Sequence, residues 1–362
     1  MRILIVGADS PCSFIVARCL AARGDVRLYG IGDRISPVLR LGNTFRALQS
    51  GVCAEDTESW YKATSEAIAR WRIEVVLPID ERANYLLAVR RSNDLPSGVA
   101  VVPTPPPESI EIARDKRRFV GFLRQERLPH PPTFRPDFDE DLVRATLPAP
   151  FLIKPAISPG GGFGIERIQN VAELVSRLAA RRDVIVQSEV DGTDFGVNLL
   201  CENGEIRAAT IQRATMPSSK PFDFAVGITF EDRPDLLALC ERLARALHWS
   251  GVANIDFRRE ATTGRFLFLE LNGRFWGSLL GSLSAGVNFP WLACCLALGA
   301  FVKPTPRVGG RYFRGAGPIL TGFLDGAHSI RLNETDWRYV RGDPIAIAAW
   351  IAMSLSPSNR RI

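Results

Sequence analysis

Three polar side chains stand at the end of an apolar strand in the second half of the chain. The strand predicted over residues 266–269 leads directly into Glu270, Asn272 and Arg274. Because side chains on a strand alternate between its two faces, Glu270 and Asn272 point the same way, and Arg274 follows if the backbone stays extended. A carboxylate, an amide oxygen and a guanidinium in this order suit Mg²⁺ bound to phosphate groups. The alternative is a strand end that simply leads into a polar turn.

A lysine and a glycine-rich loop form the second candidate group. Lys154 is the one charged residue of the apolar strand predicted over residues 150–155. The loop that follows offers backbone amides free of Cβ obstruction, which can wrap phosphate oxygens, at Gly160, Gly161, Gly162 and Gly164. The lysine precedes the loop and no Gly-Lys-Ser/Thr follows it, so the pattern is neither a P-loop nor that of a protein kinase. A bare mobile turn is the alternative.

Strands and helices alternate over the first hundred residues, which predicts a parallel α/β sheet. Asp80 and Glu81 follow the buried strand at residues 75–79. Ligands of open parallel sheets bind at the carboxyl ends of the strands, so both carboxylates could meet a substrate, although capping a helix is the alternative role for Asp80. The turn at residues 7–12 has one glycine where a dinucleotide fingerprint needs three, which argues against NAD.

A stiff, proline-rich segment at residues 103–107 marks the end of the first module. A single helix is predicted over residues 108–127, directly after it. The longest apolar run, residues 289–302, is shorter than the roughly 20 residues that span a bilayer and predicts a core helix. We assign no chemistry to the last segment.

Composition and charge narrow the class of protein. The 362 residues are 46% hydrophobic and 23% charged, as in ordinary soluble globular proteins. The net charge of +6 is spread along the chain, and the densest basic clusters, at residues 114–118 and 360–361, are not interleaved with aromatic residues as in a nucleic-acid platform. Seven cysteines without a Cys-x-x-Cys pair argue against structural zinc, and their odd number, with no secretion signal, predicts reduced thiols and a cytoplasmic location.

The order of a lysine strand, a glycine-rich loop and a later acidic strand resembles the ATP-grasp superfamily, which includes carboxylate-amine ligases and the large subunit of carbamoyl-phosphate synthetase. The resemblance covers residues 1–302. It implies an α/β plus α+β fold, in which an N-terminal parallel-sheet pre-ATP-grasp domain precedes a two-lobed ATP-grasp domain. The implied boundaries are residues 1–105, then 106–302 with a lid lobe at about 116–190 and a metal-binding lobe at about 191–302, and finally a C-terminal extension at 303–362.

The resemblance also implies which residues bind the cofactors, ATP and two Mg²⁺ ions, with Mn²⁺ as an alternative ion. The residues that match the nucleotide site are Lys116, Lys154, Gly160, Gly161, Gly162, Gly164, the hinge residues Gln187, Ser188, Glu189 and Val190, and the ribose contact Asp194. The metal-binding set is Asp256, Glu270 and Asn272, and the transferring phosphoryl group is expected to meet Lys154, Arg274 and Arg213. The hinge carries Gln187 and Ser188 where many relatives have acidic residues, which leaves its backbone contacts intact.

Simpler roles are open for three of these residues. Lys116 belongs to a basic run and could lie on a solvated helix face. Asp256 could merely pair with Arg258 or Arg259, of which only Arg258 shares its face of the strand. Arg213 could stabilise the surface of a sheet without touching a ligand.

Taken together, these features predict an ATP-dependent ligase. Mg²⁺-ATP would phosphorylate a substrate carboxylate, and an amine would attack the acyl phosphate to form an amide or peptide-like bond. Such a reaction needs positioning and charge neutralisation more than a protein base, and the chain offers no histidine or nucleophile in a catalytic motif. Activation of bicarbonate, as in carbamoyl-phosphate synthetase or a carboxylase, and a non-catalytic ATP sensor are the alternatives. The expected partners are a small carboxylate and an amine, without nucleic acid or membrane, and a homodimer is an alternative to a monomer.

Overall fold

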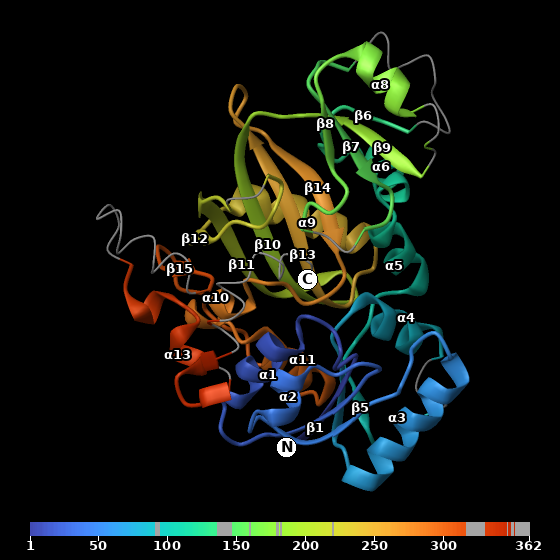
Figure 1. The fold of residues 1–362 in the computed structure, drawn as a ribbon, viewed down its shortest axis with the longest axis vertical. Helices are drawn as coiled ribbons and strands as arrows, with labels where there is room; N and C mark the ends of the chain where they lie inside the picture. The colour runs from blue at the N-terminus through green and yellow to red at the C-terminus, as the bar shows by residue number, and fades with distance from the viewer. Residues whose placement is uncertain are drawn as a thin grey trace.

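Three β-sheets form the frame of the described part of the chain. The structure, a computed structural model, describes residues 1–90, 95–135, 147–158, 161–178, 181, 183–218, 221–315, 330–345, 347, 348 and 351. A parallel sheet comes first along the chain, and two antiparallel sheets follow it. Figure 1 shows the small green sheet at the opposite end of the molecule from the blue parallel sheet, with the long strands of the third sheet between them. The predicted combination of α/β and α+β parts is confirmed.

The N-terminal sheet is parallel throughout and has the strand order β3-β2-β1-β4-β5. Its strands are β1 (Arg2–Val6), β2 (Arg27–Ile31), β3 (Phe45–Gln49), β4 (Val75–Pro78) and β5 (Ala100–Val101). The helices that connect them are α1 (Ser13–Ala21), α2 (Pro37–Leu41), α3 (Thr57–Trp71) and α4 (Glu81–Val89). The buried runs of β1 and β4 are apolar on both faces, as central strands of a covered parallel sheet must be.

The single helix predicted over residues 108–127 is wrong, because the chain breaks it at Asp115. Two helices stand there, α5 (Pro107–Arg114) and α6 (Lys116–Gln125). The backbone of Asp115 is extended between them, with φ −100° and ψ 111°, and its carboxylate accepts a hydrogen bond of 2.8 Å from the amide of Arg117. This cap places Lys116 in the first turn of α6 and turns its side chain into the protein.

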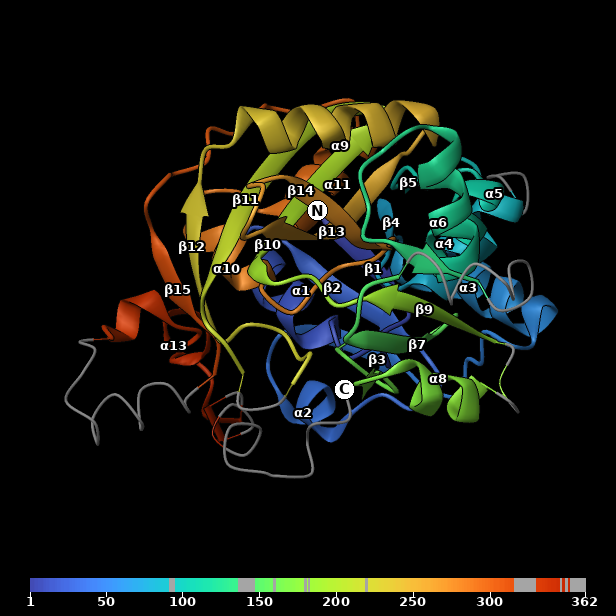
Figure 2. The same ribbon diagram turned by 90° about the horizontal axis from the view of Figure 1, so that it is seen from above.

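The small antiparallel sheet has the strand order β6-β9-β7-β8. It consists of β6 (Thr133–Phe134), β7 (Phe151–Pro155), β8 (Glu166–Ile168) and β9 (Val184–Ser188), with α8 (Val171–Leu178) packed on it. Its apolar cluster is separate from the cores of the other sheets and is made by Phe134, Phe151, Ile153, Ile168, Leu174, Val184 and Val186. Figure 2 shows this sheet beside the third, six-stranded sheet.

The long antiparallel sheet has the order β14-β13-β10-β11-β12-β15. Its strands are β10 (Gly192–Glu202), β11 (Glu205–Met216), β12 (Gly227–Glu231), β13 (Gly251–Glu260), β14 (Phe266–Asn272) and β15 (Arg311–Phe313). On one face, Leu199 packs with α9 (Pro234–Ala246); on the other, Leu200 packs with the N-terminal sheet and with α10 (Leu279–Ser284) and α11 (Phe289–Ala297). Because β15 is an edge strand here, the predicted C-terminal extension contributes to this sheet. A short 3-10 helix, η1 (Leu332–Glu334), and α13 (Trp337–Val340) follow.

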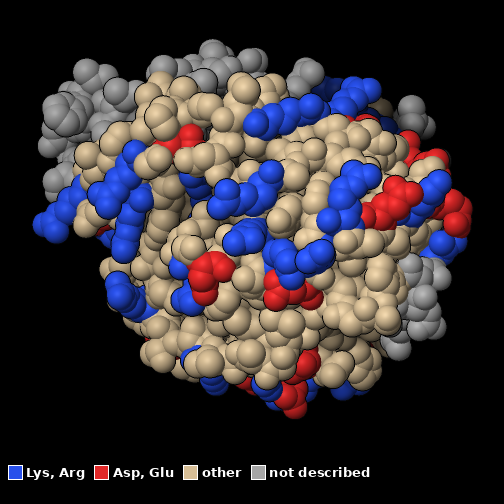
Figure 3. Space-filling model, turned by 90° about the horizontal axis from the view of Figure 1, so that it is seen from below, with Lys and Arg blue, Asp and Glu red and all other residues tan. Residues whose placement is uncertain are grey.

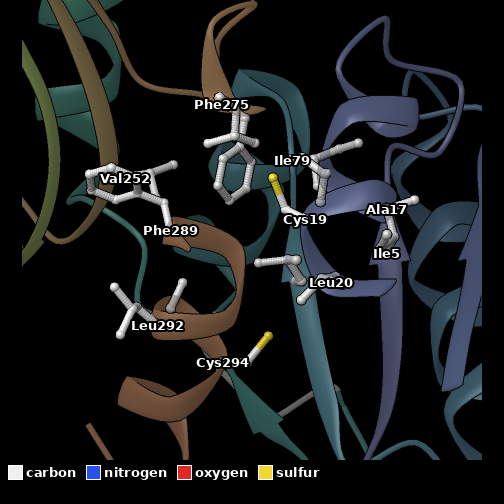
Figure 4. Close-up of a cluster of buried hydrophobic side chains, with 14 of the residues drawn as sticks. Ile5, Ala17, Cys19, Leu20, Ile79, Val252, Phe275, Phe289, Leu292 and Cys294 are labelled. Carbon is white, nitrogen blue, oxygen red and sulfur yellow. The ribbon is translucent and has the colours of Figure 1, made fainter. Parts of the chain in front are cut away.

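A shared core joins the N-terminal sheet to the end of β14. Figure 4 shows Cys19 and Leu20 of α1 among Phe275, Phe289 and Cys294, which come from the segment after β14. The run at residues 289–302 thus begins as the predicted core helix, α11. This packing holds the carboxyl edge of the parallel sheet against the polar end of β14.

A membrane and nucleic acid are the two partners that the sequence argues against, and each would require a particular feature of the structure. None of the helices in the described part of the chain is long and apolar enough to cross a membrane. Figure 3 shows the basic side chains of one face in separate groups, with acidic and uncharged residues between them. The described part of that face therefore carries no continuous basic stripe of the kind that follows a nucleic-acid backbone.

Candidate functional site

Two carboxylates face each other across the last two strands of the long sheet. Asp256 on β13 stands opposite Glu270 on β14, and Asn254 stands opposite Asn272 two pairs further along, on the same face. The amine of Lys116, at the start of α6, lies 3.6 Å from the Oε1 atom of Glu270 and donates a 2.9 Å hydrogen bond to the hydroxyl of Ser158. Lys116 is 6% exposed, so the solvated helix face considered for it is wrong.

The surroundings of the Asp256 side chain disfavour its ionised form. Burial, followed by the like charges of Glu270 and Asp194, raises the pKa of Asp256 to about 7, against the lowering effect of Arg274 and Lys154. Arg258 does not relieve this, because its guanidinium lies 2.6 Å from Asp194 and donates to the carbonyl of Val190 at 2.8 Å. A buried carboxylate whose pKa is raised by burial and by a neighbouring carboxylate is typical of a site that binds a cation.

Lys154 is buried on β7 and is held by Gln187. Its amine donates a 2.7 Å hydrogen bond to the Oε1 atom of Gln187, whose Nε2 atom donates to the hydroxyl of Thr133 at 2.9 Å. Burial, and next the charge of Lys116, lower the pKa of Lys154 to about 8, although Glu270 acts in the opposite direction. Sequence reasoning treated Gln187 only as a hinge position, and its contact with Lys154 depends on a strand pairing that the local pattern does not reveal.

The glycine-rich loop adopts a backbone that only glycine takes easily. Gly160 lies outside the described residues, whereas Gly161, Gly162 and Gly164 have φ of +64°, +73° and +72°. A Cβ atom at Gly162 would lie 2.5 Å from the backbone carbonyl oxygen of Phe222. The loop is therefore pressed against the connection between β11 and β12.

The hinge after β9 keeps one backbone donor available. The amides of Ser188 and Glu189 donate to the carbonyls of Pro132 and Pro150, both at 2.9 Å. Within the described residues, the amide of Val190 donates no hydrogen bond. Of the predicted hinge residues, Val190 is thus the one whose amide could meet a base, and the expected ribose contact Asp194 is held by Arg258.

The two arginines that were predicted to meet the phosphoryl group lie on different faces of the long sheet or its end, and only one of them lies near the carboxylates. Arg274 donates to the Oδ1 atom of Asn272 at 3.3 Å and lies 3.8 Å from the carboxylate of Glu81, so it joins β14 to the edge of the N-terminal sheet. Arg213 points to the α9 face of the long sheet and pairs with Glu231 on β12, as expected for a surface role. Asp80 caps α4, as considered, by accepting a 2.8 Å hydrogen bond from the amide of Ala83.

A buried chain of amides behind the carboxylates was missed by sequence reasoning. Asn272 donates to Asn254 at 3.4 Å, Asn254 donates to Asn198 at 3.0 Å, and Asn198 donates to the hydroxyl of Thr210 at 3.1 Å. Every member is at most 4% exposed. The position of Asn254, two residues before Asp256 on one strand, was the signal that could have found it.

Replacing Asn254 with alanine is expected to lower the free energy of unfolding by about 2 kcal/mol, because the amides of Asn198 and Asn272 each lose a partner in a buried site. Urea unfolding followed by circular dichroism measures this. Asn333→Ala on the exposed η1 should change stability by less than about 0.5 kcal/mol. Equal stability of the two variants would contradict the amide chain.

The donor set fits a hard divalent cation that a ligand helps to bind. In the described part of the chain, no three acidic, histidine or cysteine side chains gather to hold a metal ion by themselves. Asp256, Glu270 and the amide oxygen of Asn272 instead leave most coordination positions to a ligand or water, which is how Mg²⁺ is usually held beside phosphates. Lys116 and Lys154 supply positive charge next to this acidic pair.

Part of the chain is similar in sequence to known proteins. A family model described as "ATP-grasp in the biosynthetic pathway with Ter operon" matches residues 180–312. The carbamoyl phosphate synthase large chain of Thermomicrobium roseum is 26% identical over 180 residues, which cover 46% of this chain and 16% of that relative, so the chain spans about a sixth of its length.

Two solved structures extend the likeness to most of the chain. The L-amino acid ligase from Bacillus licheniformis superposes with a TM-score of 0.59 at 20% identity, over 84% of this chain and 75% of that one. The biotin carboxylase domain of a 2-oxoglutarate carboxylase from Hydrogenobacter thermophilus, solved with MgADP, ADP and bicarbonate, gives 0.62 at 15% identity, over 86% and 73%. At these identities the likeness shows the fold, and the resemblance to ATP-grasp proteins is confirmed.

Proposed function

We propose that this chain, which has the ATP-grasp fold, uses Mg²⁺-ATP to activate a substrate carboxylate as an acyl phosphate, which an amine then attacks to form an amide. The observation that carries the proposal is the opposed pair of Asp256 and Glu270 with Lys116 at 3.6 Å and the buried Lys154 close by. Paired carboxylates and paired lysines at one site suit a metal-bound polyphosphate better than any uncharged ligand.

In the proposed reaction, a carboxylate oxygen of the acid attacks the γ-phosphorus and the bond to the ADP oxygen breaks. The amine then forms the C–N bond, phosphate leaves with the oxygen that came from the acid, and the amine releases its proton to solvent. When bound, Mg²⁺ would neutralise charge on the β- and γ-phosphates. Lys116 and Lys154 orient the phosphates, Arg274 balances charge on the transferred group, and the loop through Gly162 excludes water from the acyl phosphate.

Metal binding is expected to depend on pH through Asp256. Because its pKa is raised to about 7, the Mg²⁺ affinity measured with ADP by calorimetry should rise about tenfold per pH unit up to pH 7 and level off above it. The folded state holds this proton better than the unfolded state, so the ligand-free protein loses stability as pH rises through the same range. Asp256→Asn should remove both trends, and identical pH profiles in parent and variant would contradict the assignment.

Bicarbonate is the second candidate for the acid, and carbamoyl phosphate synthase among the sequence matches favours it. ADP release with Mg²⁺-ATP should be measured against a panel of acids, bicarbonate and amines. Release that requires an organic acid supports the ligase, release that requires only bicarbonate overturns it in favour of carboxyphosphate formation, and ATP binding without any release overturns it in favour of a sensor.

The proposed location is the cytoplasm. All seven cysteines are free thiols, at positions 12, 19, 53, 201, 240, 294 and 295. Free thiols support a reducing compartment, where ATP is also available. Whether the chain acts as a monomer or a homodimer is measured by light scattering of the purified protein.

A further inference from the structure

The segment that carries Arg274 leaves the ladder of the long sheet. β14 ends at Asn272, and residues 273–278 belong to no strand or helix. Among the described residues, no backbone amide donates to the carbonyl of Gly273. The place of Arg274 therefore depends on contacts that other parts of the chain make with this segment.

One of these contacts comes from Asn84, which lies on α4 beside the N-terminal sheet. Its Nδ2 atom donates a 3.0 Å hydrogen bond to the carbonyl of Gly273, 189 positions away, and another of 3.0 Å to the carbonyl of Asp80, one turn back in the chain. Asn84 is 5% exposed. Asparagine is a poor residue for the interior of a helix, so α4 itself gains little from it. What the side chain adds is the bond to Gly273.

Gly273 is also restrained by the ring of Trp249. A Cβ atom at position 273 would lie 3.0 Å from this ring, so the backbone packs directly against it. The ring is buried, and its Nε1 atom donates to the carbonyl of Val252 at 3.2 Å. The carboxamide of Asn84 thus holds the carbonyl of a residue whose Cα atom already rests on a fixed surface.

The next two residues meet the N-terminal part of the chain through longer contacts. The guanidinium of Arg274 lies 3.8 Å from the carboxylate of Glu81, and the amide of Phe275 donates to the carbonyl of Ile79 at 3.5 Å. Figure 4 shows Phe275 beside Ile79. Of these three polar contacts, the hydrogen bond from Asn84 is the shortest, and it comes directly before Arg274 in the chain.

We propose that Asn84 is a positioning residue, which holds the backbone at Gly273 so that Arg274 meets the transferred phosphoryl group. The role of Arg274 rests on the proposed function, whereas the hold of Asn84 on the segment rests on the geometry. A displacement of about 1 Å at a reacting group can slow a reaction about a hundredfold. A side chain that touches no ligand can therefore control the rate.

Hydrogen exchange in the ligand-free protein tests this hold without ATP and without a known substrate. Asn84→Ala should raise the exchange rate of the Phe275 amide about tenfold, because its bond to Ile79 opens more often once Gly273 is released. Mass spectrometry of overlapping peptides measures the rate. An exchange rate at Phe275 equal to that of the parent would overturn the proposal.

Two further variants separate the bond to Gly273 from the stability of α4. Tyr61→Phe removes the buried hydrogen bond from its hydroxyl to the carbonyl of Leu86 on the same helix, and it should change neither exchange nor turnover by more than about twofold. Asn84→Ser keeps a donor for the carbonyl of Asp80 but is too short to reach Gly273, so it should behave like Asn84→Ala. Parent-like exchange in Asn84→Ser, or raised exchange in Tyr61→Phe, would assign the effect to the helix and overturn the proposal.

The effect on the reaction has its own readout. With an acid found by the ADP-release panel, Asn84→Ala should lower kcat about 30-fold and change KM for ATP by less than about threefold, because Lys116 and Lys154 lie on other elements. In an Arg274→Met background the same substitution should change kcat by less than about twofold, since the group that it positions is gone. Equal losses in both backgrounds would overturn the action through Arg274. If no acid turns over while exchange at Phe275 rises as expected, the proposed function fails and the hold on the segment stands.

Discussion

Glu270→Gln is expected to reduce Mg²⁺-dependent ATP turnover about a thousandfold. The substitution keeps the size of the side chain but removes a charge that faces Asp256 across the strand pair and lies 3.6 Å from Lys116. A cation shared between two carboxylates then has only one, and Lys116 loses its acidic neighbour. ADP release at saturating Mg²⁺ measures the effect, and a Mg²⁺ titration shows whether weaker metal binding is its cause.

The control for this variant is Glu205→Gln, an exposed residue of β11 in the same sheet. We expect it to retain full turnover. The free energy of unfolding of ligand-free Glu270→Gln should stay within about 1 kcal/mol of the parent, because the lost contact with Lys116 is offset by relief of the repulsion with Asp256. Turnover of Glu270→Gln equal to that of Glu205→Gln would remove Glu270 from the site.

Lys154→Met should weaken ATP binding about a hundredfold and lower kcat by a similar factor, since a buried ammonium aimed at phosphate is replaced by an apolar chain of similar length. The ligand-free protein should lose little stability, because burial of the unpaired charge, which lowers the pKa of Lys154 to about 8, already opposes folding. Calorimetric titration with a non-hydrolysable ATP analogue measures the binding.

Lys62→Met, on the exposed side of α3, is the matched control and should bind the analogue as the parent does. The pKa of Lys154 adds a second check. In the ligand-free protein, the unfolded chain holds this proton above pH 8 while the folded protein releases it, so stability gains from Lys154 as pH rises from about 8. Equal analogue affinity in Lys154→Met and Lys62→Met would contradict a role of Lys154 in phosphate binding.

Much of the acidic strand could be predicted because its signal is local. Glu270 and Asn272 lie two residues apart on an apolar strand, and alternation alone places them on one face. Lys154 stood out for a similar reason, as a charge inside an apolar strand that later proves to be buried. Periodicity also predicted the parallel sheet, whose central strands are apolar throughout.

What could not be predicted depends on which strands pair and where a helix breaks. The hydrogen bond from Lys154 to Gln187 joins residues 33 positions apart, and it depends on the pairing of β7 with β9. The break at Asp115 was hidden by good helix formers on both sides, although aspartate is a favoured cap. The face of Arg213 could be fixed only once β11 was placed between β10 and β12.

Transfer of a phosphoryl group from ATP to a carboxylate can be tested directly by following an oxygen atom of the acid. An acid that supports ADP release is labelled with ¹⁸O in its carboxylate and incubated with the protein, Mg²⁺-ATP and the amine, and the released phosphate is analysed by mass spectrometry. One ¹⁸O atom is expected in each phosphate formed with the amide. Phosphate without ¹⁸O from the acid would show that ATP is split by water or that another group is phosphorylated, and would contradict the formation of an acyl phosphate.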